Sequence, residues 1–500
     1  MIDTELYFSK YRSQIIGNEQ SYTTPYGEKD LCYADWTASG RLYRPIEQTI
    51  TEKIGPWLAN VHSETSYTGA LMTQTYEQAR KIIKKHVNAN ANDVLIACGT
   101  GMTGALARLQ RILGLRIPER WQDNFDIAEE KRPVVLISHM EHHSNHTSWL
   151  ETVAKVAVIP ADDEGLIDIK AFKELLQKYE GRELIVSITA CSNVTGITTP
   201  FHTIAALTHQ YGGKCFVDLA CSAPYVHIDM HPEIAEEKLD AIFFSPHKFL
   251  GGPGSCGILV FDKALYKNKI PDQPGGGTVV FTDPWGNHIY KNDVEQREDG
   301  GTPGFLQTIK TAMAIQLKET MTVERIQERE EEINTMVFAK LGNVEGCTIL
   351  AAQHQERLSI FSFYLEEVHY ELVVQLLNDR FGIQARGGCS CAGTYGHYLM
   401  LIDEDHSKRI MQDSEFGCTL NKPGWVRVSF HPTMTDAEVN FVCDAIIAIT
   451  ENAKYWRADY KRNTDGFRSV LNHESPDVTS FFEAALETKS AEGNRIYKNK

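Results

Sequence analysis

The stretch of sequence that says most about the fold is residues 243–252, FFSPHKFLGG. It places Lys248 between two apolar runs, at the end of a strand predicted over residues 241–245. Burying a charged lysine is costly, and the loss of water lowers the pKa of its amine and makes that amine a nucleophile. The stretch therefore predicts a reactive lysine where a strand ends.

Short apolar strands alternate with helices on both sides of this segment. Strands are predicted over residues 94–98, 134–138, 156–159, 184–189, 214–218, 241–245 and 257–261. Helices are predicted over residues 76–87, 103–113, 168–179 and 203–211. Apolar strands with helices between them are typical of a mainly parallel sheet that is covered on both faces. The predicted fold class is therefore α/β.

The pattern changes near residue 270, where a Gly/Pro-rich loop begins. Beyond it we expect one long, charged and solvated helix over residues 308–341. Strands over 359–365 and 425–430 and a closing helix over 437–452 follow. This part of the chain is therefore predicted to be α+β.

The predicted organisation has four segments. They are an N-terminal segment (residues 1–35), a large α/β domain (36–305), a smaller C-terminal domain (306–455) and a polar extension (456–500).

The composition is that of a folded, acidic protein. The chain has 500 residues, 42% of them hydrophobic, and a formal net charge of −16, which excludes nucleic acid as a general partner. The N-terminus lacks the apolar core of a signal peptide, and no apolar run approaches the roughly 20 residues that span a bilayer. The eleven cysteines, an odd number in a long chain, indicate reduced thiols. We expect a cytoplasmic protein with no membrane partner.

An acid follows the strand that precedes the lysine strand. Asp218 ends the strand predicted over 214–218, and a loop, a helix and a strand separate it from Lys248. Both side chains are therefore expected at one sheet edge, where ligands of open α/β sheets bind. A Schiff-base lysine with an acid for a pyridinium nitrogen is the pairing that pyridoxal phosphate requires. The sequence thus predicts this cofactor.

A glycine-rich turn follows the strand over 94–98. Residues 99–104, GTGMTG, match G-x-G-x-x-G and open a helix, where backbone N–H groups bind phosphate. A dinucleotide site would also need an acid at the end of the next strand, but that strand is followed by His139. A single phosphate, a nicotinamide cofactor of an oxidoreductase and a plain helix-capping turn all remain open.

Residues 141–146, EHHSNH, follow another strand. His142 and His146 are spaced to share a metal, but no third ligand lies nearby in the sequence, so no metal is expected. An imidazole at this place is suited to stacking on a planar ligand. An ordinary polar loop is the alternative.

The last candidate is residues 386–393, RGGCSCAG. Arg386 is suited to bidentate binding of a carboxylate, and a cysteine beside a cation is suited to nucleophilic attack. Cys389 and Cys391 also suggest a metal or redox pair, but no partner cysteines at metal spacing follow.

Taken in order, these segments resemble the class V aminotransferase family of fold type I pyridoxal phosphate enzymes, on its cysteine desulfurase and selenocysteine lyase branch. The resemblance covers roughly residues 31–450 and includes Tyr33-Ala34-Asp35 as an opening strand and Asn60-Val61-His62 as an N-x-H segment. It implies a large, mainly parallel sheet domain of the seven-stranded type and a smaller α+β C-terminal domain.

The resemblance also implies roles for individual residues. Those that would hold the cofactor are Thr100, Gly101, Ser245 and His247 at the phosphate, His142 stacked on the ring, Asn193 beside the cofactor, Asp218 at the ring nitrogen, Lys248 as the Schiff-base lysine, and Thr278 reaching the phosphate across a dimer interface. Those that would meet the substrate are Arg386, Asn193, Arg427 and the persulfide-forming Cys391.

Three features depart from the family pattern. Cys221 stands where a glutamine is usual, and a thiol is a weaker hydrogen-bond donor. Ser63-Glu64 follows the N-x-H segment in place of Arg-Gly, and Cys389 is an additional thiol.

The leading hypothesis is an enzyme that converts L-cysteine to L-alanine and leaves the sulfur on Cys391 as a persulfide, with Lys248 or His142 moving protons. A sulfur-acceptor protein and a homodimer are the expected partners. The alternatives are another pyridoxal phosphate reaction on a different amino acid, a nicotinamide-dependent oxidoreductase, and a sulfur-relay binding protein without turnover.

Overall fold

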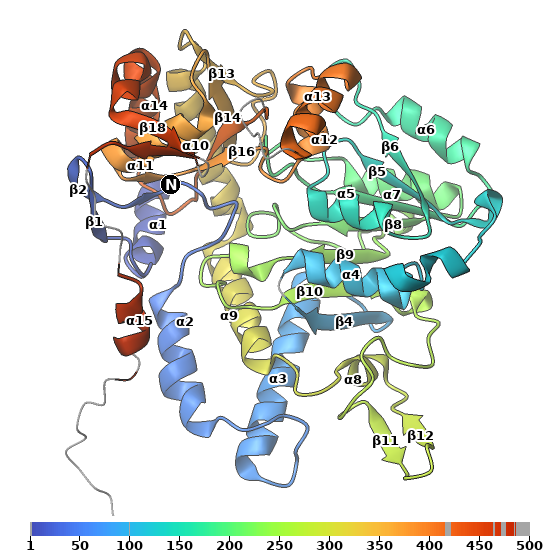
Figure 1. The fold of residues 1–500 in the computed structure, drawn as a ribbon. Helices are drawn as coiled ribbons and strands as arrows, with labels where there is room; N and C mark the ends of the chain where they lie inside the picture. The colour runs from blue at the N-terminus through green and yellow to red at the C-terminus, as the bar shows by residue number, and fades with distance from the viewer. Residues whose placement is uncertain are drawn as a thin grey trace, which may run out of the picture.

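The computed structural model describes residues 3–99, 101–415, 422–463, 466–471, 477–484 and 486. A seven-stranded sheet lies at its centre (Figure 1), in the order β4-β10-β9-β8-β7-β5-β6. In chain order its strands are β4 (Asp93–Cys98), β5 (Val134–Ser138), β6 (Lys155–Ile159), β7 (Leu184–Thr189), β8 (Lys214–Asp218), β9 (Ala241–Phe244) and β10 (Gly257–Asp262). Five neighbouring strands are parallel, and β10 runs antiparallel to both β4 and β9. The mainly parallel α/β sheet predicted from the sequence is confirmed.

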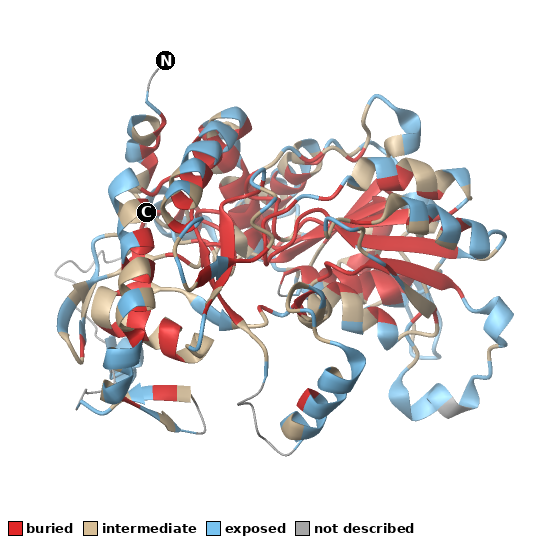
Figure 2. Cartoon of the chain, turned by 90° about the horizontal axis from the view of Figure 1, so that it is seen from above, coloured by how far each residue is buried: buried red, intermediate tan, exposed pale blue. Residues whose placement is uncertain are grey.

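Helices cover both faces of this sheet because alternate strand residues point to opposite faces. The helices that cover the sheet are α3 (Tyr67–His86), α4 (Met102–Ile112), α5 (His143–Leu150), α6 (Ile169–Lys178), α7 (Phe201–Gln210) and α9 (Phe305–Met321). On one face, α4 and α5 pack against Ile96, Ile185 and Phe216. On the other face, α3, α7 and α9 pack against Leu95 and Val217. Figure 2 shows most of the central strands buried between partly exposed helices; the edge strand β6 is only partly buried.

A second sheet, antiparallel and four-stranded, has the order β13-β14-β17-β16. Its strands are β13 (Cys347–Ile349), β14 (Ile360–Leu365), β16 (Arg386–Gly388) and β17 (Trp425–Ser429). The helices α10 (Val323–Leu341), α11 (Tyr370–Phe381) and α14 (Asp436–Trp456) supply apolar residues to the same core. Strand β16 is an edge strand of this sheet.

The prediction of one continuous helix over residues 308–341 is wrong. Helix α9 ends at Met321 and α10 begins at Val323, because Thr322 adopts φ +57° and breaks the helical path. The Thr322 side chain then accepts the N–H of Arg325 and caps α10. The expectation of a solvated helix is also wrong for α9, because more than half of its 17 residues are buried between α3 and the sheet.

Several shorter elements complete the fold. They are α1 (Thr4–Arg12), the hairpin β1 (Ser21–Thr24) and β2 (Gly27–Asp30), the parallel pair β3 (Cys32–Tyr33) and β15 (Ile383–Gln384), α2 (Arg44–Gln48), the hairpin β11 (Val279–Thr282) and β12 (His288–Tyr290), α8 (Val294–Glu298), α12 (Gly393–Leu399), α13 (Glu404–Glu415), the hairpin β18 (Tyr460–Asn463) and β19 (Gly466–Ser469), and α15 (Thr479–Ala484). None of the helices in the described part of the chain has the length and apolar character that a membrane crossing requires.

Candidate active site

One edge of the central sheet collects the polar residues that the sequence singles out. Strands β5, β7, β8 and β9 all end at this edge, and so does β4, because β10 runs antiparallel to both of its neighbours. A cavity of about 210 Å³ opens there. Its lining residues are Thr37, Ala38, Met102, Thr103, His142, Ser144, Thr189, Cys191, Asn193, Asp218, Ala220, Cys221, Ser245, His247, Lys248, Arg386, Ser390, Cys391 and Arg427.

Lys248 and Asp218 reach the cavity from neighbouring strands. Lys248 ends a short 3₁₀ helix, Pro246–Lys248, that follows β9, and Asp218 is the last residue of β8. Burial lowers the pKa of the Lys248 amine, against the opposing effect of Cys221 and Asp218. Burial raises the pKa of Asp218 to about 6, although the N–H of Ala220 donates to its Oδ1 at 2.8 Å. The cavity therefore holds a lysine that releases its proton easily and a carboxyl that binds one easily.

His142 lies at the start of α5 and acts as its N-cap. Its Nδ1 accepts the N–H of Ser144 at 3.1 Å, so the neutral ring carries its proton on Nε2. Burial, together with the nearby Lys248 charge, lowers the pKa of His142 to about 3. The ring is therefore neutral at physiological pH and is suited to stacking on a flat ligand.

The metal hypothesis for His142 and His146 gains no geometric support. The Nδ1 of His146 lies 3.0 Å from Oγ1 of Thr394, and Nδ1 of His142 accepts the N–H of Ser144, so each ring already uses one nitrogen. Among the described residues, no group of three His, Cys, Asp or Glu side chains could hold a metal ion.

A cradle of small and hydroxyl-bearing residues lies where β4 runs into α4. The main-chain N–H of Met102, the first residue of α4, donates to Oγ of Ser245 at 2.8 Å. Gly101 adopts φ +78°, and a Cβ at this position would lie 2.8 Å from the same oxygen. His247 lines the cavity next to them, and burial lowers its pKa to about 4. Thr100, predicted at the same place, lies outside the described residues.

The nicotinamide hypothesis for residues 99–104 conflicts with the topology of the sheet. A dinucleotide motif needs the strand before the glycine-rich turn and the strand after the helix in one parallel βαβ unit. Here β4 lies at the sheet edge beside the antiparallel β10, and the strands β10, β9, β8 and β7 separate it from β5. The turn therefore fits a single phosphate rather than a dinucleotide.

Two arginines meet a shared aspartate at the mouth of the cavity. Nε of Arg386, on β16, lies 3.2 Å from Oδ2 of Asp35, and Nη2 of Arg427, on β17, lies 2.8 Å from Oδ1. Arg427 is 3% exposed and Arg386 is 48% exposed at the side chain, so one guanidinium is fixed and the other faces solvent. The sequence marks Asp35 only as part of an opening strand, and its pairing with both arginines is visible only in the fold.

Asn193 connects the large sheet to the loop that carries Cys391. Its side-chain amide donates to the main-chain carbonyl of Ser390 at 2.7 Å, and its main-chain carbonyl accepts from Nη1 of Arg427 at 3.1 Å. Ser390 and Cys391 both adopt positive φ, +48° and +57°. The loop thereby turns the exposed Cys391 thiol toward the mouth of the cavity.

Cys221 has a buried thiol partner that the sequence does not reveal. Its sulfur lies 3.7 Å from the carbonyl oxygen of Ser192, and the sulfur of Cys191 lies 3.6 Å from the same oxygen. A hydrogen bond from Cys191, with the nearby charge of Lys248, lowers the pKa of Cys221. Both thiols line the cavity beside Asp218.

The remaining predicted residue, Thr278, lies away from this cavity. Its buried Oγ1 donates to the carbonyl of Gly275 at 2.6 Å, at the base of the β11–β12 hairpin that projects from the body (Figure 1). The next turn, residues 299–301, packs against it, and the N–H of Gly301 donates to the carbonyl of Gly276. Its predicted role across a dimer interface stays a prediction.

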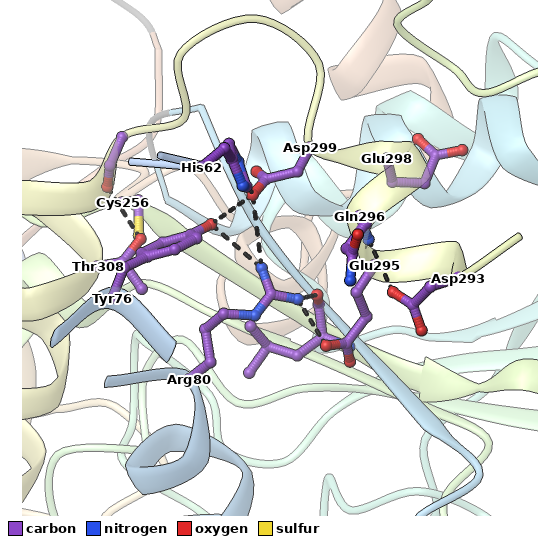
Figure 3. Close-up of polar contacts among 12 residues, drawn as sticks. His62, Tyr76, Arg80, Cys256, Asp293, Glu295, Gln296, Glu298, Asp299 and Thr308 are labelled. Atoms are coloured by element: carbon purple, nitrogen blue, oxygen red, sulfur yellow. Dashed lines mark hydrogen bonds and ion pairs between the residues drawn. The ribbon is translucent and has the colours of Figure 1, made fainter. Parts of the chain in front are cut away.

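The N-x-H segment reaches the same turn (Figure 3). Nε2 of His62 lies 3.4 Å from Oδ2 of Asp299, which also accepts the hydroxyl of Tyr76 at 3.0 Å. Behind them the buried Arg80 guanidinium pairs with Glu295 at 2.6 Å. Two segments of the family resemblance therefore meet at residues 299–301, outside the Lys248 cavity.

Curated relatives of this chain share one name. A protein of Halalkalibacterium halodurans named "Probable cysteine desulfurase" is 28% identical over 366 residues, which are 72% of this chain and 84% of that relative. A protein of Staphylococcus aureus with the same name is 27% identical over 368 residues, which are 73% of this chain and 84% of that relative.

Solved structures share the fold. A cysteine desulfurase of Thermococcus onnurineus superposes with a TM-score of 0.68 at 22% identity, covering 84% of this chain and 95% of the other. A cysteine desulfurase of Escherichia coli gives the same TM-score at 21% identity, covering 89% of this chain and 98% of the other. The model of the family described as "Aminotransferase class-V" matches residues 32–442. This protein therefore belongs to the aminotransferase class-V family.

Proposed function

We propose that this protein is a pyridoxal phosphate-dependent cysteine desulfurase, which converts L-cysteine to L-alanine and retains the sulfur on Cys391. The observation that carries the proposal is the single cavity that joins Lys248 and Asp218 at its base to Arg386, Arg427 and Cys391 at its mouth. The family uses pyridoxal phosphate, and curated relatives named as cysteine desulfurases support the choice of substrate.

The cavity fits pyridoxal phosphate on two observations. Among the described residues, Oδ2 of the buried Asp218 receives no hydrogen bond although its residue faces the cavity, which suits a protonated ring nitrogen. The cradle of Gly101, Ser245 and the N-terminus of α4 leaves no room for a Cβ at Gly101 and presents polar groups suited to a phosphate. Both ends of the cofactor thus have a matching partner.

When bound, pyridoxal phosphate would act as an electron sink for the substrate's Cα. The chain's own residues would supply the rest. Asp218 would hold a proton at the ring nitrogen, and His142, neutral because of its lowered pKa, would stack on the ring without adding charge. The amine of Lys248 would take the proton from Cα, because burial lowers its pKa and so favours the uncharged form that can accept a proton.

The mouth of the cavity would bind and then cleave the substrate. Arg386 and Arg427 would bind the substrate carboxylate, as guanidinium groups do in bidentate pairs. The thiolate of Cys391 would attack the substrate sulfur, so that a sulfur–sulfur bond forms as the carbon–sulfur bond breaks. The substrate carbon would keep the electron pair of that bond and take up a proton, which gives the methyl group of alanine. The exposure of Cys391 suits such an attack and a later transfer of the sulfur.

Product analysis tests the reaction. We expect the cofactor-loaded enzyme to release alanine from L-cysteine and, with a reducing thiol present, sulfide. Cys391→Ser should abolish both products, and Cys389→Ser serves as the matched control on the same loop. Absence of alanine would contradict the proposal, and unchanged turnover in both variants would favour another class V reaction in which Cys391 has no chemical role.

The lysine assignment has a spectroscopic test. Cofactor-loaded protein should show the visible absorbance band of covalently held pyridoxal phosphate, and Lys248→Ala should lose that band while it still binds the cofactor. Persistence of the band in Lys248→Ala would show that another amine holds the cofactor.

We also propose that the protein acts as a homodimer. The meeting of Thr278 and His62 at the 299–301 turn, away from the Lys248 cavity of the same chain, supports the proposal that these residues serve a partner subunit.

A further inference from the structure

A groove lies outside the mouth of the cavity, on the other side of the Cys391 loop. Its volume is about 620 Å³. Its walls are α11, the edge strand β16, the 389–391 loop and strand β19. Helix α11 packs against both strands, and α11 and β16 lie in the upper part of Figure 1. The groove and the cavity share Arg386, Ser390 and Cys391. A molecule in the groove would therefore approach the Cys391 thiol from the side away from Lys248.

One wall of the groove comes from outside the family match. That match ends at residue 442, whereas Gly466, Phe467 and Arg468 line the groove from β19. The β18–β19 hairpin is fixed by packing of β19 on α11, with Phe467 only 7% exposed and the Arg468 guanidinium 3.3 Å from Oε1 of Gln375. The C-terminal extension, which the sequence suggests only as a polar tail, thus forms part of the approach to Cys391.

The groove carries an excess of positive charge in an acidic protein. Arg468, Lys422 and Arg386 line it, and Glu371 is its one acidic lining residue among those described. Oε2 of Glu371 lies 3.5 Å from Arg462 behind the groove, so that carboxylate is already engaged. Within the described residues, neither Arg468 nor Lys422 forms an ion pair, and both are exposed. These two cations are available to an anionic ligand.

The size and walls of the groove favour a small molecule. Its volume falls within the roughly 300–1,000 Å³ of small-molecule sites. Tyr370, Val374 and Phe467 give it apolar walls, and the cations stand at the rim, which is the arrangement that orients a ligand with a short backbone and terminal carboxylates.

We propose that this groove binds a small thiol that carries carboxylates, and that this thiol accepts the sulfur from Cys391. The ligand's thiolate attacks the outer sulfur of the Cys391 persulfide, a new sulfur–sulfur bond forms on the ligand, and Cys391 leaves as a thiolate. No external oxidant or reductant is needed, because one persulfide replaces another. The transfer step rests on the proposed function, whereas binding in the groove does not.

Binding is tested without turnover. The probe is S-methylglutathione, which has two carboxylates and a blocked sulfur, measured by calorimetry against cofactor-loaded enzyme. We expect saturable binding that weakens roughly fivefold in Arg468→Ala, the size expected for one exposed charge pair. Lys461→Ala removes the same charge from the opposite strand of the hairpin, at a residue that does not line the groove, and should bind like the wild type. No binding, or equal weakening in both variants, would overturn the proposal.

Transfer is tested in a single turnover. Enzyme loaded with L-cysteine is first checked by mass spectrometry for a sulfur on Cys391, and failure at this stage counts against the proposed function alone. Loaded enzyme is then mixed with glutathione or with uncharged 2-mercaptoethanol. We expect Arg468→Ala to slow transfer to glutathione roughly fivefold and to leave transfer to 2-mercaptoethanol unchanged. Equal effects on both thiols would overturn the proposal. It would also be overturned if glutathione failed to displace S-methylglutathione from the enzyme while an acidic cysteine-containing peptide accepted the sulfur.

Discussion

The substitution Asp218→Asn tests how much stability the site costs the protein. Asp218 is 3% exposed, and burial raises its pKa to about 6 from an ordinary value of 3.8. Because the unfolded chain gives up this proton more readily than the folded chain, stability falls as the pH rises from about 4 to about 6. At 1.36 kcal/mol per pKa unit, the ionised carboxylate costs the cofactor-free protein about 3 kcal/mol above that window.

Asparagine keeps the shape of the side chain, removes the charge and still accepts the N–H of Ala220. We therefore expect Asp218→Asn to stabilise the cofactor-free protein by up to about 3 kcal/mol at about pH 8, and by about 1 kcal/mol at about pH 4.5. Urea unfolding of variant and wild type at the two pH values measures the difference, and the comparison at each pH cancels the other titrating groups.

Asp240 provides a control of opposite sign. Asp240 is also fully buried, but Nε2 of His209 lies 2.7 Å from its Oδ2. The N–H of Cys215 donates to the same oxygen at 2.9 Å. These bonds outweigh the cost of burial and lower the pKa of Asp240. The ionised carboxylate therefore stabilises the protein at neutral pH, and this stabilisation is lost only as the pH falls through the lowered pKa. Asp240→Asn should therefore destabilise the protein at both pH values, because the pKa of Asp240 lies below its ordinary value of 3.8 and the carboxylate is still ionised at about pH 4.5. A pH-independent effect of Asp218→Asn, or the same sign in both variants, would refute the reasoning.

Three further predictions concern the packing around the site. Arg80→Met should lower the free energy of unfolding in urea by about 3–5 kcal/mol, because it leaves buried acceptors without their cation. Lys81→Met, at the exposed neighbouring residue, should cost little, and similar values for the two variants would contradict this prediction. Gly101→Ala should weaken retention of pyridoxal phosphate about tenfold or more, since the added Cβ would meet Ser245 and the backbone φ at this residue is +78°. Gly114→Ala is the control: its φ is +72° but the space around it is open, so this variant should retain the cofactor. Light scattering should give twice the chain mass of 56.3 kDa, and a single-chain mass would remove the basis for a shared site.

The sequence predicts the sheet well because its strands are buried on both faces. Residues 134–138, 184–189 and 214–218 are predicted and observed with the same bounds. A strand buried on both faces is a continuous apolar run, which is a local signal. Lys248 and Asp218 are predictable for the same reason, since Asp218 ends such a run and Lys248 lies in the short turn after another.

Other features depend on contacts between distant segments. The break at Thr322 requires a positive φ at a residue that does not favour it, and only the packing of α9 and α10 fixes it. Asp35 meets Arg386 and Arg427 only because β3 pairs with β15, just before β16. The β18–β19 hairpin has too few apolar residues to predict a strand, and its packing on α11 places it.

The charges around the cavity explain how an acidic protein can attract acidic ligands. The guanidinium groups of Arg386 and Arg427 are opposed by Asp35 and, above about pH 6, also by Asp218. Below about pH 6 the site is therefore positive within a chain of net charge −16, and such a local field draws anions toward it. The association rate of pyridoxal phosphate should then fall several-fold between about 0.01 M and about 0.3 M salt, as the screening length shortens. A rate that does not change with salt would mean that short-range contacts alone, rather than this field, bring the cofactor to the site.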